Sequence, residues 1–145
     1  MTALVDTCII IDALANRGEF APPAQELLLC GSEKRVELVI SAKTMLDVHY
    51  ILKHYFHDEP IVRGHLSNLL DAVSVIDTAG ACCIRALNSV TTDFEDAVQI
   101  ETAIDEGVDC IVTRDGGGYS NSLIQVLTAG GLLSLLDSCK ASERQ

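Results

Sequence analysis

The chain has 145 residues, of which 48% are hydrophobic and 4% aromatic, so it can bury a core of mainly aliphatic side chains. Ten Lys and Arg against 21 Asp and Glu give a net charge of −11, which argues against a broad phosphate-binding surface but does not exclude nucleic acid as a substrate. No apolar run approaches the roughly 18 residues of a membrane span, and no basic region precedes an apolar one at the N-terminus. We therefore expect a cytoplasmic protein that does not contact a membrane.

Five short apolar stretches alternate with segments that have helical patterns. The predicted strands are Ala3–Val5, Val36–Ile40, Ala72–Ile76, Cys110–Thr113 and Ile124–Leu127. The predicted helices are Ile9–Leu14, Ala24–Cys30, Ser41–Tyr55, Ile61–Leu70, Thr78–Leu87, one that begins at Thr92, and Leu132–Leu136. This alternation predicts a three-layer α/β/α fold with a central parallel sheet of about five strands. We expect residues 1–145 to form one domain, with a frayed tail from Lys140.

The helix before the fourth predicted strand carries two unusual aspartates. Thr92 and Glu95 have the spacing of a capping box, so this helix is expected to begin there, with Glu95 on its solvated face. At 100° per residue, Asp93 and Asp96 share the side of the helix that is defined by Phe94, Ala97, Ile100, Ala103 and Ile104. A carboxylate on a core-facing side is costly unless it is paired, hydrogen-bonded or bound to a cation. Both aspartates are therefore candidate site residues.

Four aspartates from four separate segments are expected at one edge of the sheet. Asp6 and Asp115 follow predicted strands, and Asp47 and Asp96 lie in early turns of helices that should begin at that edge, where ligands of parallel sheets bind. Asp6 also fits a helix N-cap, which is compatible with metal binding, and Asp47 fits a surface position equally well. Clustered carboxylates repel one another unless a cation shares them, and their oxygens suit Mg²⁺ or Mn²⁺ rather than zinc. Such an ion activates water and stabilises charge on a phosphoryl oxygen, so the pattern indicates metal-assisted phosphodiester hydrolysis.

Three other groups of residues have structural interpretations. The histidines at 49, 54, 57 and 65 match no zinc pattern and are expected to be solvated. The six cysteines contain no C-x-x-C pair, and Cys8 and Cys110 are expected to be small core residues. The glycines 116–118 lack the ending of a P-loop, so they are expected to form a flexible rim beside Asp115.

Four short motifs hold the four aspartates: Leu4–Asp12 (LVDTCIIID), Ser41 with Asp47, Asp93–Ala97 (DFEDA) and Cys110–Asp115 (CIVTRD). Together they resemble the PIN domain family, and the resemblance covers nearly the whole chain. That family contains metal-dependent ribonucleases, many of them toxins of toxin–antitoxin pairs. The resemblance implies a metal-dependent endoribonuclease with an RNA substrate, a cognate antitoxin and a homodimeric assembly. It implies that Mg²⁺ or Mn²⁺ is held by Asp6, Asp47, Asp96 and Asp115, with Asp93 the poorer match to the third acid, and that Thr7 and Thr113 orient carboxylates.

Two departures from the family pattern concern the site itself. Asp47 stands where Glu is common and has a shorter reach, and Cys8 stands where Asn is common and cannot replace the hydrogen bonds of an amide. We expect the first to alter metal affinity and the second to loosen the site.

Two other function classes compete with the nuclease. A catalytically silent PIN domain that binds RNA or protein is favoured by the low positive charge, whereas retention of four acids favours the nuclease. A receiver-type or haloacid-dehalogenase-type phosphotransfer domain is disfavoured, because Asp6-Thr7-Cys8 lacks an Asp-x-Asp pattern and no Lys follows the late strand.

Overall fold

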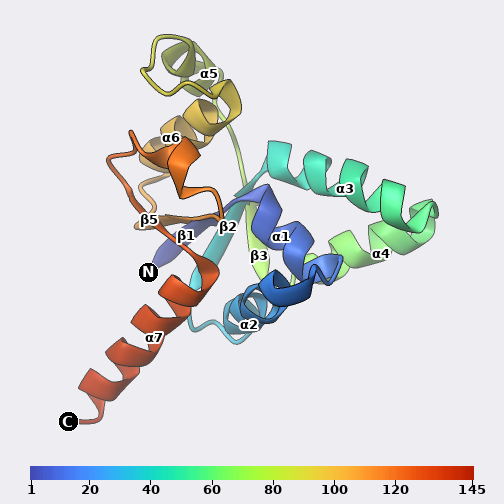
Figure 1. The fold of residues 1–145 in the computed structure, drawn as a ribbon, viewed down its shortest axis with the longest axis vertical. Coiled ribbons are helices and arrows are strands. Elements are labelled where there is room, and N and C mark those ends of the chain that lie inside the picture. The colour runs from blue at the N-terminus through green and yellow to red at the C-terminus, as the bar shows by residue number, and fades with distance from the viewer.

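The computed structural model describes residues 1–145 and contains a five-stranded sheet with helices around it (Figure 1). The strands are β1 (Thr2–Val5), β2 (Glu37–Ser41), β3 (Val73–Ile76), β4 (Cys110–Val112) and β5 (Gln125–Leu127). The α-helices are α1 (Thr7–Leu14), α2 (Ala21–Ser32), α3 (Ala42–Phe56), α4 (Glu59–Leu69), α5 (Gly80–Leu87), α6 (Phe94–Glu106) and α7 (Ala129–Glu143), and the 3₁₀-helices are η1 (Gly18–Phe20) and η2 (Gly116–Tyr119). All strand pairs are parallel, in the order β3-β2-β1-β4-β5. The predicted α/β fold with a five-stranded parallel sheet is confirmed.

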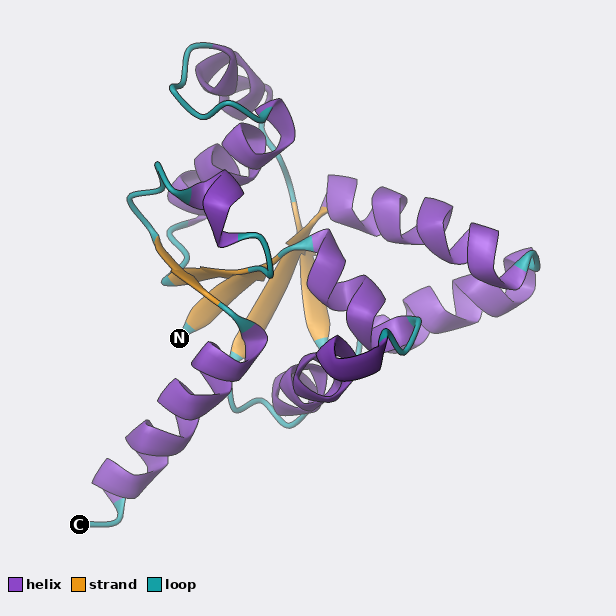
Figure 2. Ribbon diagram, in the orientation of Figure 1, coloured by secondary structure: helices purple, strands orange, loops and turns teal.

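Helices cover both faces of the sheet because its central strands are apolar on both sides. Ala3 and Val5 of β1 pack into a core cluster with residues of α1, α2, α3, α4 and α7. Leu4, which points to the opposite face, packs with Ile100 and Ala103 of α6. In Figure 2 the strands accordingly lie between α6 on one side and α1 and α2 on the other. The two clusters make this a three-layer structure.

The order of the strands brings three chain turns together at one edge of the sheet. The carboxyl ends of β2, β1 and β4, which are neighbours in the sheet, lead into α3, α1 and η2. Asp6 is the N-cap of α1, Ser41 is the N-cap of α3, and Asp115 precedes η2 in the same manner. Polar caps are therefore concentrated at this edge, because each turn must satisfy the free N–H groups of the helix that it starts.

The start of α6 differs from the prediction. Asp93, and not Thr92, is the N-cap, and its Oδ1 accepts a hydrogen bond of 3.0 Å from the backbone N–H of Asp96. Asp is a stronger N-cap than Thr, so the prediction of a Thr92 capping box was wrong. Asp93 is consequently exposed at the helix end, and Phe94 and Ile104 are also 48% and 43% exposed, so their predicted core-facing positions were wrong.

Other predicted segments also change. The glycines 116–118 lie in η2 beside Asp115, and α7 extends well beyond the predicted Leu132–Leu136. The residues from Lys140, predicted to be frayed, continue α7 as far as Glu143. All six cysteines are free thiols, with Cys110 buried and Cys8 partly buried. None of the helices combines the length and the apolar character that crossing a bilayer requires.

Candidate functional site

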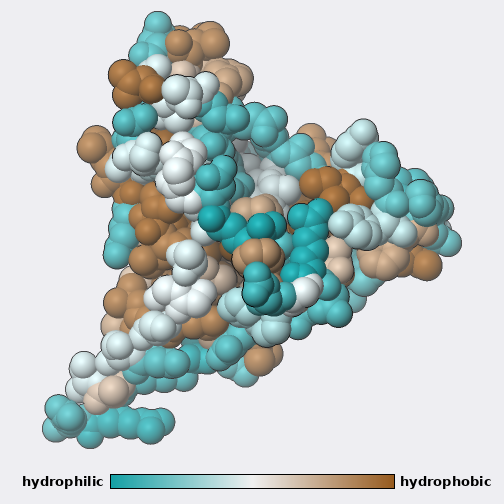
Figure 3. All heavy atoms as spheres, in the orientation of Figure 1, coloured by the Kyte–Doolittle hydropathy of each residue, from teal (hydrophilic) through white to brown (hydrophobic).

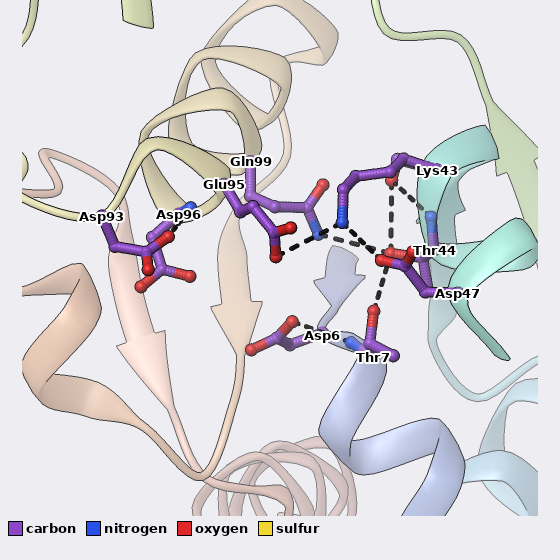
Figure 4. A network of polar contacts seen from close by, with 10 residues as sticks. Asp6, Thr7, Lys43, Thr44, Asp47, Asp93, Glu95, Asp96 and Gln99 are labelled. Carbon is purple, nitrogen blue, oxygen red and sulfur yellow. Dashed lines mark hydrogen bonds and ion pairs between the residues drawn. The ribbon is translucent and has the colours of Figure 1, made fainter. Parts of the chain in front are cut away.

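A cavity of about 520 Å³ opens at the edge of the sheet where α1, α3 and α6 begin. Its lining includes all four predicted aspartates, together with Thr7, Cys8, Lys43, Thr44, Glu95 and Gln99. Figure 4 shows Asp6 and Thr7 at the start of α1, facing Asp96 and Glu95 from α6 and Lys43 and Asp47 from α3. Two predicted site residues lie outside this lining, because Asp93 caps α6 and Thr113 is buried behind the cavity.

Asp6 is held in position by hydrogen bonds to both of its carboxylate oxygens. Oδ1 accepts a hydrogen bond of 2.8 Å from the backbone N–H of Thr7, and Oδ2 accepts one of 2.7 Å from the hydroxyl of Thr113. The hydroxyl oxygen of Thr113 in turn accepts a hydrogen bond of 3.1 Å from the backbone N–H of Asp115. Thr113 therefore couples the ends of β1 and β4, and the orientation of Asp6 is fixed by one group at the start of α1 and one just after β4.

Asp96 and Asp115 crowd against Asp6. Burial and, after it, the nearby charges of Asp93, Asp6 and Asp115 together raise the pKa of Asp96 to about 6. Gly118 allows this approach, because a Cβ at that position would lie 2.1 Å from Asp96 Oδ2 and 3.5 Å from Asp115 Oδ2. The carboxylates of Asp6 and Asp115 thus repel that of Asp96 inside the cavity.

Tyr119 adds an unpaired donor to the same place. Its side chain is 2% exposed, and its hydroxyl has no hydrogen-bond partner. Burial raises the pKa of Tyr119 strongly, as do the nearby charges of Asp6 and Asp96, so the hydroxyl keeps its proton. Buried hydroxyl groups normally have partners, and this one lies near the carboxylates of Asp6 and Asp96, which can accept a hydrogen bond from it. Nothing in the sequence singles out Tyr119, since an aromatic residue after a glycine run has no distinctive pattern.

Asp47 lies in the cavity but is neutralised there. Lys43 Nζ forms ion pairs with Asp47 and, at 3.4 Å, with Glu95. Burial lowers the pKa of Lys43, but the two carboxylates outweigh this effect and the net shift is upward. Lys43 was not predicted, although its position four residues before Asp47 is the spacing of an ion pair on a helix. Glu95, predicted on a purely solvated face, lines the cavity.

The residues of the cavity fit a hard divalent cation. As the side chains lie, no three His, Cys, Asp or Glu residues form a ready-made coordination group. The donors are nevertheless carboxylate and hydroxyl oxygens, which suit Mg²⁺ or Mn²⁺. A cation would relieve the repulsion that raises the pKa of Asp96, and the missing side chain of Gly118 leaves Asp96 room beside Asp115.

Cys8, the residue expected to loosen the site, lies beside Asp6 and Thr113. Its Sγ lies 3.7 Å from Asp6 Oδ2 and 3.7 Å from Thr113 Oγ1. Burial and then the charge of Asp6 raise the pKa of Cys8, so it remains a thiol. A thiol is a weak donor, and it supports Asp6 less firmly than an amide would.

Comparisons with known proteins agree with this architecture. No curated protein matches the sequence significantly. Among solved structures, PAE2754 from Pyrobaculum aerophilum has a TM-score of 0.68 and 20% identity, covering 95% of this chain and 96% of that chain. VapBC2 from Rickettsia felis, bound to a DNA fragment from its promoter, has a TM-score of 0.66 and 14% identity, covering 88% and 98%. VapC20 from Mycobacterium tuberculosis, described as a sarcin-ricin loop cleaving toxin, has a TM-score of 0.66 and 13% identity, covering 86% and 98%.

At these identities the solved structures show a shared fold alone. The family assignment comes from the sequence, where residues 2–116 match the profile of a family described as the PIN domain. The match spans β1 to the start of η2 and so includes all four aspartates of the cavity. The chain belongs to the PIN domain family.

Proposed function

We propose that this PIN domain is an endoribonuclease that hydrolyses RNA phosphodiester bonds with Mg²⁺ or Mn²⁺. The observation that carries the proposal is the crowding of Asp6, Asp96 and Asp115 around one volume, with the pKa of Asp96 raised to about 6. Carboxylates held together against their repulsion are typical of a site that shares a cation. Membership of a family of nucleases supports the same reaction class.

The residues divide into metal ligands and groups that orient them. Asp6, Asp96 and Asp115 would hold the ion, and Asp47, which is paired with Lys43, would complete the acidic site. Thr7 and Thr113 fix the Asp6 carboxylate through the hydrogen bonds described above. Asp93 sets the start of α6 and contributes negative charge beside Asp96. When bound, the ion would lower the pKa of a water molecule and stabilise charge on a phosphoryl oxygen.

We further propose that the protein is the toxin of a toxin–antitoxin pair and that it forms a homodimer. Several structures that share its fold are described as toxin–antitoxin complexes or VapBC assemblies, including one from Klebsiella pneumoniae. A cavity lined by carboxylates in a chain of net charge −11 favours a partner that inserts a basic side chain. Co-purification of the chain with the product of a neighbouring gene, and the mass of the complex in solution, test both points.

The decisive experiment is cleavage of a mixed pool of structured and single-stranded RNA by the purified protein. Reactions contain Mn²⁺, chelator, or Mn²⁺ with the Asp96→Asn variant. The matched control is Asp71→Asn, because Asp71 is exposed, lies outside the cavity and makes no side-chain hydrogen bond. We expect cutting by the wild type and Asp71→Asn in Mn²⁺, and none with chelator or with Asp96→Asn. Equal cutting by Asp96→Asn would refute the site.

A catalytically silent RNA- or protein-binding module is the second candidate. The observation that favours it is the pairing of Lys43 with Asp47 and Glu95, which leaves little free positive charge at the cavity. The same assay separates the two candidates, because a silent module binds RNA in a gel-shift experiment but leaves it intact in every reaction.

A further inference from the structure

Arg17 is the one basic side chain of the cavity whose charge is not neutralised. Six of the ten Lys and Arg side chains lie within ion-pair distance of a carboxylate: Arg35, Lys43, Lys53, Arg63, Arg85 and Arg114. The four without such a partner are Arg17, Lys34, Lys140 and Arg144, and among these Arg17 alone lines the cavity. In a chain of net charge −11, a free cation beside an acidic site requires an explanation.

A tight turn after α1 determines the position of Arg17. Asn16 and Gly18, on either side of it, both adopt left-handed conformations, with φ of 52° and 51°. Such a conformation is costly for most residues, and Asn and Gly are those that tolerate it best. The turn is closed by a hydrogen bond of 3.1 Å from the Arg17 N–H to the Asp12 carbonyl. This turn therefore positions Arg17 in the lining of the cavity.

A neutral group orients the guanidinium. Arg17 Nη2 donates a hydrogen bond of 3.2 Å to the hydroxyl of Tyr55, and the guanidinium carbon lies 5.9 Å from the centre of that ring. Because the partner is a hydroxyl and not a carboxylate, the positive charge stays available to an anion. A guanidinium has five N–H donors in a planar fork, so four remain to bind a phosphate.

Tyr50 supplies an exposed aromatic surface in the same cavity. It lies on α3 one turn after Asp47, lines the cavity and is 66% exposed. Its ring packs against His54 at a centroid distance of 4.6 Å, which supports it from one side. Figure 3 shows hydrophilic side chains gathered over α1 and a hydrophobic patch over the neighbouring α3. Exposed aromatic rings beside basic side chains are typical of sites that stack single-stranded bases.

We propose that Arg17 and Tyr50 form a subsite for single-stranded RNA, in which Arg17 binds a backbone phosphate and Tyr50 stacks on an unpaired base. The inference rests on the proposed function, because it places this nucleotide next to the scissile phosphate at the aspartates. The subsite takes only unpaired nucleotides, since the bases of a duplex are stacked within the helix and cannot reach Tyr50.

Binding measured without cleavage tests the subsite separately from catalysis. Fluorescence anisotropy of a labelled single-stranded oligoribonucleotide, in chelator at low salt, compares the wild type with Arg17→Gln. The matched control is Arg144→Gln, which removes the same charge from an exposed residue at the end of α7. We expect Arg17→Gln to lower the affinity about tenfold and to reduce the slope of log K against log salt by about 0.7, whereas Arg144→Gln has little effect.

Two tyrosine variants test the stacking. Tyr50→Leu should lower affinity by about 5- to 150-fold, and Tyr50→Phe should restore it, because stacking requires the ring and not the hydroxyl. An equal loss in Arg17→Gln and Arg144→Gln, or tighter binding of duplex than of single-stranded RNA, would overturn the subsite. Metal-dependent cleavage that is indifferent to Arg17 would refute the subsite alone, and Arg17-dependent binding without cleavage would refute the nuclease alone.

Discussion

Replacement of Asp96 by Asn should stabilise the metal-free protein at neutral pH. The structure raises the pKa of Asp96 from 3.8 to about 6, and one unit corresponds to 1.36 kcal/mol, so the upper limit of the destabilisation is about 3 kcal/mol. Asp96 is partly exposed, and solvent screening reduces this figure to about 1–2 kcal/mol. Loss of a carboxylate from the first turn of α6 costs about 0.3–1 kcal/mol through the helix dipole. The net gain is about 1 kcal/mol.

The effect has a defined pH dependence. An acid whose pKa is higher in the folded state binds a proton on folding, so the stability of the wild type falls as pH rises from about 4 to about 6 and is then level. The advantage of Asp96→Asn should therefore be absent at pH 4 and complete by pH 7. Urea unfolding at both pH values, in chelator, measures it, and 1 kcal/mol corresponds to about 2–4 °C in Tm for a chain of this size.

Metal should make the wild type more stable than Asp96→Asn, the reverse of their order in chelator. An ion that binds only the folded state adds about 2.7 kcal/mol at a concentration of 100 times its Kd, so millimolar Mg²⁺ or Mn²⁺ should raise the Tm of the wild type and barely change that of Asp96→Asn. If Asp96→Asn is less stable than the wild type at pH 7 in chelator, the carboxylates do not repel one another. If metal raises the Tm of both proteins equally, the carboxylates do not share an ion.

Three further substitutions give distinct results. Gly118→Ala should weaken metal binding at little cost in Tm, because the new Cβ would displace only the end of the Asp96 side chain, 2.1 Å away. Tyr119→Phe should leave the metal-free protein as stable as the wild type or up to about 1 kcal/mol more stable, since a buried unpaired hydroxyl is removed. The same substitution should lower metal affinity about tenfold, because the carboxylates are less well oriented. Arg114→Leu should destabilise by about 3–5 kcal/mol, because the Asp12 carboxylate, 0% exposed, loses bonds of 2.6 and 3.1 Å.

Each has a control. Gly116→Ala, where nothing lies within 4 Å of the added Cβ, should bind metal like the wild type in calorimetry, and a loss equal to that of Gly118→Ala would contradict the steric argument. Unchanged metal affinity in Tyr119→Phe would show that the hydroxyl does not orient the site. The double variant of Arg114→Leu with Asp12→Leu should recover most of the lost stability in urea unfolding, and no recovery would show that the cost of Arg114→Leu is lost packing.

The sheet and the sheet-edge positions of the aspartates could be predicted from local patterns. Apolar runs such as Cys110–Val112, with helical segments between them, leave a parallel sheet as the natural arrangement, and Asp6 and Asp115 follow strands directly. The start of α6 was mispredicted because Thr92 and Asp93 both fit a cap, and only the structure shows that the carboxylate of Asp93 accepts the hydrogen bond.

Tertiary structure alone decided which charges face one another. The sequence determined that four aspartates would lie at one edge, because strand ends and helix starts are local features. It did not determine that Lys43 pairs with Asp47 and neutralises its charge, or that Gly118 and Tyr119 lie next to the other acids. Nor did it identify Arg17, whose partner Tyr55 is 38 residues away in sequence. These pairings depend on how α1, α3 and η2 pack around the cavity, and contacts over such separations have no signature in local periodicity.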